Sequence, residues 1–182
     1  MFQQSSKKPL VSVILNTHNG SKFLKQCISS VLKQSYKKFE LIIFDNKSTD
    51  TTKKIVRKFF KNKRIKYYYS KKYLKLYQAR NSAVLKSKGS LISFIDSDDW
   101  WIRDKLSKQV NYFIFNKEIK IVYSNLFLYF EKNKKYKLFS KSPLYNGNIT
   151  QLLLNNFKMP ILTTMLKREL FKKNKFNKKY DI

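Results

Sequence analysis

The chain has 182 residues, 42% of them hydrophobic, which suits one globular domain with a sizeable core and excludes two ordinary ones. Its 40 Lys and Arg against 11 Asp and Glu give a net charge of +29, which points toward nucleic acid or an anionic membrane surface. Only five of the 40 are arginine, and the lysines are spread along the chain, so a general compositional bias explains the charge equally well. We expect a single domain, residues 1–182.

No stretch approaches the ~18 apolar residues of a spanning helix, and Met1 to Lys8 lacks the apolar core of a signal peptide. We therefore expect a cytoplasmic protein, peripheral at the inner face of the membrane, with Lys167 to Lys179 as the densest basic segment. The single cysteine, Cys27, has no disulfide partner and no metal-ligand spacing around it, so it is predicted to be a small core residue.

Taken in chain order, the first predicted elements form a β-α-β unit. The apolar runs 11–15 and 41–44 are nearly continuous, which is typical of strands covered on both faces of a parallel sheet. Between them, residues 23–32 carry apolar side chains at helical spacing, and Ser21 is placed to cap that helix.

The same alternation continues to residue 95. Ser48, Thr49 or Asp50 can cap a second helix, whose apolar face holds Ile55, Val56, Phe59 and Phe60. A weaker strand at 65–69, a helix at 78–88 stopped at Gly89, and a third apolar run at 91–95 follow. This β-α-β-α-β-α-β order predicts an α/β, Rossmann-like open sheet that is mostly parallel, with helices on both faces and right-handed crossovers.

Beyond residue 96 the pattern is weaker. Leu106, Val110 and Phe113 indicate another helix, and residues 119–130 another strand or strand pair. Residues 131–147 form a basic, turn-rich segment, and residues 149–157 are predicted to form a short helix.

Each of the three apolar runs ends abruptly in a polar segment, at residues 16–20, 45–50 and 96–99. The carboxyl ends of parallel strands meet at one edge of an open sheet, where such folds bind ligands. The pattern therefore predicts a binding site at this edge.

The third segment is Asp96-Ser97-Asp98-Asp99, which holds three of the chain's 11 acids in four positions. Carboxylates this close raise each other's pKa unless a cation lies between them. Aspartate oxygens without nearby Cys or His suit Mg²⁺ or Mn²⁺, held jointly with a substrate phosphate. The alternative is that Asp98 or Asp99 caps a helix opening at Trp100.

The glycine content argues against two other phosphate-binding classes. Gly20, Gly89 and Gly147 are the only glycines, so neither GxxxxGK[ST] nor GxGxxG occurs, which disfavours kinases and dinucleotide dehydrogenases. A dehalogenase-like phosphotransferase, with Asp96 as nucleophile and Asp98 as acid, would carry these residues after its first strand, whereas three predicted strands precede them here.

Four motifs, in order, resemble those of family 2 glycosyltransferases and cover residues 9 to about 116. They are Val11-Ser12-Val13-Ile14-Leu15-Asn16-Thr17-His18-Asn19, Phe39-Glu40-Leu41-Ile42-Ile43-Phe44-Asp45-Asn46-Lys47-Ser48-Thr49-Asp50-Thr51, Ala79-Arg80-Asn81, and Gly89-Ser90-Leu91-Ile92-Ser93-Phe94-Ile95-Asp96-Ser97-Asp98-Asp99-Trp100. The resemblance implies a GT-A fold and inverting, metal-dependent transfer of a sugar from a nucleotide diphosphate, most often a UDP-sugar. The implied acceptor is a glycan or lipid-linked molecule of cell-surface polysaccharide synthesis.

The resemblance also implies residue roles. Thr17, His18 and Asn19 would line the base and ribose pocket, and Asp45 would bond the base. Arg80 would lie beside the nucleotide, and the Asp-x-Asp pair, Asp96 and Asp98, would hold ribose and metal. Four residues depart from the family pattern, and they put the identity of the donor base in doubt. They are Asn16, His18, Asn46 and Lys47.

Plainer roles remain open for three of these residues. Asp45 can be a structural acid that bonds nearby backbone amides, and Arg80 a surface cation of its helix. His18, the only histidine, fits a polar pocket wall or a surface residue better than a proton-transfer group.

Residues 9–116 would thus be the nucleotide-sugar-binding part and residues 117–182 an incomplete acceptor-side part. The resemblance places the general base in an acidic pair beyond Ile182, and Asp181 aligns before that pair. Two alternatives follow: a non-catalytic basic protein that binds nucleic acid or anionic membrane, and an inactive fragment that only binds the nucleotide. The resemblance makes nucleic acid the less favoured partner.

Overall fold

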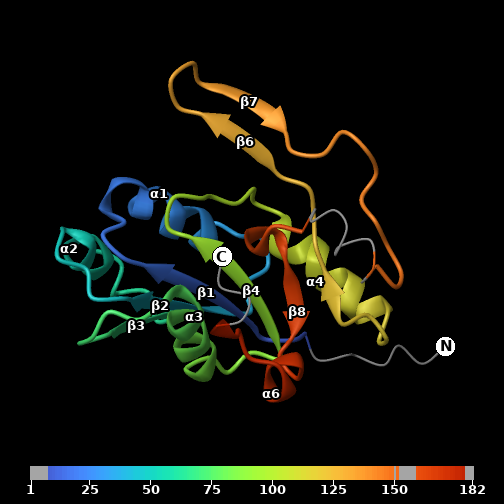
Figure 1. Ribbon diagram of the computed structural model, residues 1–182, viewed down its shortest axis with the longest axis horizontal. Coiled ribbons are helices and arrows are strands. Elements are labelled where there is room, and N and C mark those ends of the chain that lie inside the picture. The colour runs from blue at the N-terminus through green and yellow to red at the C-terminus, as the bar shows by residue number, and fades with distance from the viewer. Residues whose placement is uncertain (1–7, 150, 152–158, 179–182) are drawn as a thin grey trace.

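The computed structural model describes residues 8–149, 151 and 159–178, and its centre is a six-stranded sheet (Figure 1). In chain order the strands of this sheet are β1 (Val11–Thr17), β2 (Phe39–Asp45), β3 (Ile65–Tyr69), β4 (Leu91–Asp96), β5 (Ile121–Val122) and β8 (Met165–Lys167). Their spatial order is β3-β2-β1-β4-β8-β5. The first four are parallel, and β8 is antiparallel to both β4 and β5, so the mostly parallel α/β sheet is confirmed.

Helices cover both faces of the sheet, as predicted. The helices are α1 (Ser21–Leu32), α2 (Thr52–Arg57), α3 (Leu76–Leu85), α4 (Lys105–Phe115) and α6 (Leu170–Lys173), with a short 3-10 helix η1 (Ile161–Thr163). Successive side chains of β1 point to opposite faces, so Val13 packs in the core under α1, α2 and α4, and Ile14 in the core under α3 and α6. Cys27 is fully buried in the first of these cores.

The N-terminus of α1 is capped from another loop. Ser21 is the first helical residue, so it is not the cap that the sequence suggested, and its amide donates to Oδ2 of Asp50 at 3.1 Å. Oδ1 of the same carboxylate accepts from the amide of Thr52, at the start of α2, at 2.9 Å. One aspartate therefore serves two helix starts. Partial burial by itself raises the pKa of Asp50, but the hydrogen bonds from Thr52 and Ser21 outweigh it and lower the pKa to about 2.

We expect Asp50→Ala to lower the free energy of unfolding by about 1 kcal/mol, as loss of a helix cap does. Because the folded pKa lies below the usual 3.8, this stability is present above pH 4 and is lost as the pH falls toward 2. Urea unfolding at several pH values measures it. Asp104→Ala is the control, since Asp104 precedes α4 but its side chain pairs with Lys108 and makes no capping hydrogen bond. Equal losses in both variants at pH 7 would contradict the shared cap.

Helix α3 ends at Leu85, three residues earlier than predicted. Gly89 is therefore not the helix stop. It lies against β1, where its amide donates to Oγ of Ser12 at 2.7 Å. A Cβ at Gly89 would lie 2.6 Å from the Ser12 nitrogen and 2.7 Å from the Leu10 carbonyl oxygen. Close backbone approach, rather than a left-handed turn, requires this glycine.

The predicted strand pair at 119–130 belongs to two different sheets. β5 joins the main sheet, whereas β6 (Phe127–Phe130) forms an antiparallel hairpin with β7 (Lys135–Leu138). β7 lies in the segment that was predicted to be turn-rich. The strand was missed because its lysines made the strand pattern hard to recognise. The predicted helix at 149–157 lies almost wholly outside the described residues. No helix of the described part is long and apolar enough to cross a membrane.

Candidate functional site

The carboxyl ends of β1, β2 and β4 lie side by side at one edge of the sheet (Figure 1). Thr17 is in register with Asp45, and Asn16 with Asp96. The chain runs from β1 outward to β2 and β3, then returns to β4 on the other side of β1, so the strand order reverses at this point. Open α/β sheets bind ligands at such reversals.

Asp45 is fully buried at the end of β2 and has protein partners on both oxygens. Oδ1 accepts from the amide of Ser48 at 2.8 Å, and Oδ2 accepts from the hydroxyl of Tyr67 at 2.6 Å. Burial, and then the bond to this carboxylate, raise the pKa of Tyr67 strongly, so its proton stays on the phenol. Asp45 thereby holds the loop after β2, and its oxygens retain further lone pairs.

Asn19 holds the same loop from the β1 side. Its backbone is left-handed, with φ 51°, and its Oδ1 accepts from the amides of Thr49 at 2.8 Å and Asp50 at 3.3 Å. Its own amide donates to Oγ of Ser48 at 2.9 Å. Asparagine suits this place, since it tolerates left-handed backbone and accepts several bonds.

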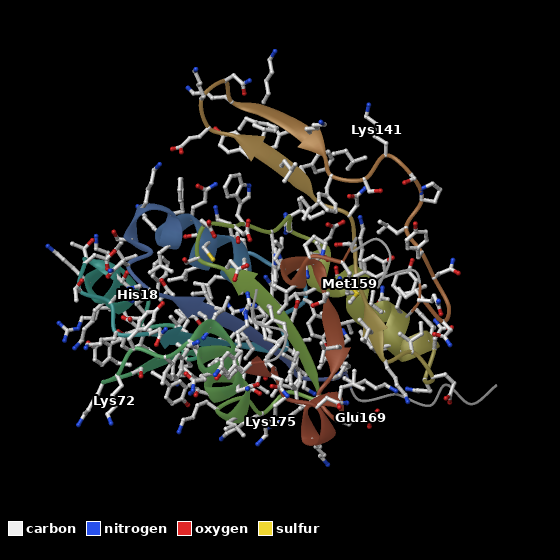
Figure 2. The ribbon with its side chains drawn as sticks, viewed as in Figure 1. His18, Lys72, Lys141, Met159, Glu169 and Lys175 are labelled. Atoms are coloured by element: carbon white, nitrogen blue, oxygen red, sulfur yellow. The ribbon has the colours of Figure 1, made fainter. Side chains whose placement is uncertain are left out.

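His18 is exposed beside this loop, toward the α2 side of the sheet (Figure 2). Its Nδ1 donates to the carbonyl of Asn46 at 2.8 Å, and its Nε2 lies 3.4 Å from the side-chain nitrogen of Asn19. Its ring packs edge-on against Tyr73, with centroids 4.8 Å apart. His18 and Tyr73 thus form an exposed aromatic pair beside the loop after β2.

Asn46 explains one departure from the family pattern. Its Nδ2 donates to the carbonyl of Leu74 at 2.8 Å, and its Oδ1 accepts from the amide of Leu74 at 2.9 Å. An ionised aspartate could not donate the first bond. The neutral amide therefore fixes the loop that carries Tyr73 against His18.

The acidic segment follows β4 without starting a helix. The next helix, α4, begins at Lys105, so the predicted capping by Asp98 or Asp99 is wrong. Asp98 is exposed, and Oδ1 of Asp96 accepts a bond from Arg80 of α3 at 3.3 Å. Burial, followed by the charges of Asp96 and Asp98, raises the pKa of Asp99 to about 6.

Gly20 brings the β1–α1 loop against this acidic segment. A Cβ there would lie 2.5 Å from Oγ1 of Thr17 and 2.7 Å from Oγ of Ser97. The Thr17 hydroxyl and the Asn16 side-chain nitrogen are buried and have no hydrogen-bond partner among the described residues. Such groups are costly unless water or a ligand completes them.

Sequence reasoning did not anticipate the role of Asn81. Its side chain bonds both backbone groups of Phe176, donating to the carbonyl at 2.8 Å and accepting from the amide at 3.0 Å. The Phe176 ring lies 5.9 Å from the Arg80 guanidinium carbon. A segment 95 residues away thus supports the arginine that bonds Asp96. Asn81 belongs to the third of the four motifs, but nothing in the sequence pairs it with Phe176.

The described residues contain no group of three or more His, Cys, Asp or Glu side chains arranged to hold a metal ion. Two neighbouring aspartates with free lone pairs nevertheless fit Mg²⁺ or Mn²⁺, which proteins commonly bind through one or two carboxylates together with substrate phosphates. The oxygen-only donor set favours these ions over zinc or copper.

This sheet, with polar strand ends at its reversal point, is the fold of the GT-A glycosyltransferases. The chain belongs to glycosyl transferase family 2, whose model matches residues 12–175.

Similar proteins carry glycosyltransferase names. An uncharacterized glycosyltransferase of Haemophilus influenzae is 36% identical over 92% of this chain and 66% of its own length. WfgD of Escherichia coli, a UDP-Glc:alpha-D-GlcNAc-diphosphoundecaprenol beta-1,3-glucosyltransferase, is 38% identical over 64% of this chain and 45% of its own length. The chain thus spans two thirds or less of these relatives.

A solved structure of the mannosyltransferase PcManGT from Pyrobaculum calidifontis, in complex with GDP-Man and Mn²⁺, superposes with a TM-score of 0.69. The match covers 92% of this chain and 47% of that one at 18% identity, so it establishes the fold.

Proposed function

We propose that the edge formed by β1, β2 and β4 binds a nucleotide diphosphate sugar, with a UDP-sugar as the donor. The observation that carries this proposal is the juxtaposition of the three strand ends, which brings the acidic segment of β4 to the loops of Asn19 and Asp45. The UDP-glucose specificity in the name of WfgD supports the choice of base.

In this proposal the loop of Thr17, His18 and Asn19 lines the base and ribose pocket. Its shape is held from within the protein, since Asn19 bonds the neighbouring loop and His18 bonds Asn46. Asp45 lies at the floor of that pocket and bonds the base through its remaining lone pairs. A pocket fixed before binding loses little entropy when the donor arrives.

Arg80 and the Asp-x-Asp pair are assigned to the diphosphate end of the donor. Asp96 bonds ribose, and Asp96 with Asp98 would hold Mg²⁺ or Mn²⁺, which supplies positive charge to a departing diphosphate. Arg80, already directed at Asp96, adds a second fixed positive charge beside the same group. The Mn²⁺ in the PcManGT complex supports a divalent ion in this fold.

We further propose an inverting transfer to a lipid-linked or glycan acceptor in cell-surface polysaccharide synthesis. The diphosphoundecaprenol-linked acceptor in the name of WfgD supports this class, and such an acceptor would place the protein at the cytoplasmic face of a membrane. The acceptor hydroxyl requires a general base.

Calorimetric titration of the full chain with UDP, with and without Mn²⁺, tests the donor site. We expect Asp98→Ala to weaken UDP binding about tenfold or more in the presence of Mn²⁺ and to change it little without the metal, since its carboxylate acts through the ion. Asp104→Ala is the matched control and should bind like wild type, since Asp104 lies just before α4 and pairs with Lys108.

The competing class is a binder driven only by the +29 charge. It would bind UDP and unrelated polyanions with a steep dependence on salt, with or without Mn²⁺. A UDP affinity that changes neither with Mn²⁺ nor with the Asp98 substitution would therefore contradict the proposed function.

A further inference from the structure

The β6–β7 hairpin stands away from the body of the molecule (Figure 1). Every residue of both strands is exposed. A two-stranded hairpin alone is at best marginally stable in water, so one with this many exposed apolar side chains is expected to have a binding partner.

The exposed side chains of the hairpin are aromatic, aliphatic and cationic. Cross-strand pairing puts Phe127 with Leu138 and Tyr129 with Tyr136 on one face, and sets Leu128 and Phe130 opposite lysines on the other. Phe127 is 64% exposed and Tyr136 61%. The lysines of the hairpin and its turn are Lys132, Lys134, Lys135 and Lys137. Lys141, just after β7, points away from the body (Figure 2).

A basic groove of about 950 Å³ adjoins the hairpin. The groove runs along the outer side of α1, and its lining includes Lys22, Lys25, Lys33, Lys37, Arg103, Trp100 and Trp101, with no acid. Two contacts join it to the hairpin: Lys22 pairs with Glu131 at 2.9 Å, and the rings of Trp100 and Tyr129 lie 5.4 Å apart. The only acid of the hairpin and its turn, Glu131, is thereby neutralised.

We propose that the hairpin and this groove together dock the protein on an anionic phospholipid bilayer. Aromatic side chains favour the interface between headgroups and hydrocarbon, and lysines near an anionic surface are attracted to it. The combination fits a bilayer better than a second copy of the chain, because two such surfaces would repel each other through their lysines.

The basic segment 167–179 is less suited to this role than its charge suggested. Its aromatic residues do not face solvent as those of the hairpin do, since Phe171 and Phe176 pack against Phe94 in the core under α3. The hairpin, by contrast, has cations and unburied aromatic side chains on the same element. This proposal does not depend on the donor site, because no residue of the hairpin or groove is assigned to it.

Vesicle co-sedimentation of the full chain tests the proposal, using phosphatidylcholine alone and phosphatidylcholine with phosphatidylglycerol. The double substitution Leu128→Ser with Phe130→Ser changes no charge, and we expect it to weaken binding to the anionic vesicles about tenfold. A charge variant, Lys135→Glu with Lys137→Glu, should lose as much. Its matched control, Lys58→Glu with Lys61→Glu, alters exposed lysines between α2 and β3 and should stay within about twofold of wild type.

Fluorescence locates the contact. The chain has two tryptophans, and both line the groove, so lipids brominated on their acyl chains should quench the emission of wild type more than that of the serine variant. Equal binding by wild type and the serine variant, or equal losses in both charge variants, would overturn the proposal. So would hairpin-dependent dimerisation without lipid, seen by light scattering. UDP binding by each variant shows separately that the fold and donor site are intact.

Discussion

We expect Gly89→Ala to lower the free energy of unfolding by about 3 kcal/mol or more, the largest stability effect of any small substitution considered for this chain. The new Cβ would lie 2.6 Å from the backbone nitrogen of Ser12 and 2.7 Å from the carbonyl oxygen of Leu10. These atoms belong to backbone beside the central strand β1, which cannot move aside as a flexible side chain can. Relief of the overlap would break the bond from the Gly89 amide to Ser12.

The substitution would also destabilise a buried acid, because Ser12 connects Gly89 to that acid. Its hydroxyl accepts from Gly89 at 2.7 Å and donates to Oε1 of Glu40 at 2.6 Å. The same oxygen accepts from the amide of Lys88 at 2.5 Å. Displacement of Gly89 therefore leaves a buried carboxylate short of donors, which adds to the steric cost.

Gly147→Ala is the matched control for this measurement. Gly147 has φ +77° and no heavy atom within 4 Å of an added Cβ, so only backbone strain of about 1 to 2 kcal/mol is expected. Urea unfolding of both variants compares the two causes. A Gly89→Ala protein as stable as wild type, or no less stable than Gly147→Ala, would show that the backbone beside β1 yields to the new methyl group.

The second large effect concerns a lysine inside the protein. Lys105, at the start of α4, is buried, and its Nζ donates to Oε1 of Gln109 at 2.7 Å and Oγ of Ser93 at 3.3 Å. It also lies 4.1 Å from the ring centroid of Trp101. None of these partners carries a negative charge, so burial lowers the pKa of Lys105 to about 7.

We expect this lysine to make the protein more stable as the pH rises from 7 to 10. Over that range the unfolded chain keeps the Lys105 proton, because an ordinary lysine pKa is near 10.5, while the folded protein has released it. The unfolded state thus binds more protons, and stability rises by at most about 1.4 kcal/mol per pH unit. Urea unfolding at about pH 7, 8, 9 and 10 measures this slope.

Lys105→Met separates the contribution of Lys105 to this slope from that of other groups that titrate in the same pH range. The difference between wild type and this variant should change with pH, and the variant should be relatively most stable near pH 7, where the buried charge is costly. Lys108→Met is the control, since Lys108 lies on the same helix with its side chain 69% exposed. A difference that stays constant from pH 7 to 10 would mean that Lys105 keeps its charge in the folded protein.

The pattern of apolar runs was sufficient to predict the parallel half of the sheet and the edge at which the candidate site lies. It worked there because β1, β2 and β4 are covered on both faces, so most of their side chains are apolar. β8 was not anticipated, since it has three residues and is defined by its pairing with β4 and β5. A short strand that pairs with residues far away in the sequence shows no detectable periodicity of apolar residues.

The candidate site likewise has features that the sequence predicted and features that it did not. Except for Arg80 on α3, the residues expected near it lie at or just after the strand ends, because position along a strand determines where a side chain emerges. Hydrogen bonds between loops could not be read from the sequence: Asn46 with Leu74 joins residues 28 apart, and Asn81 with Phe176 joins residues 95 apart. Helix starts were misjudged for a similar reason, since Asp50 caps α1 across a distance of 29 residues.

The place of β8 in the sheet affects how the chain is assembled during synthesis. β8 pairs with β4 on one side and β5 on the other, so the main sheet cannot be completed until residues 165–167 have emerged from the ribosome. Until then β4, which carries the acidic segment, presents an open edge that can pair with another nascent chain. We therefore expect a fragment ending near residue 116, which lacks β8, to aggregate through the open edge of β4.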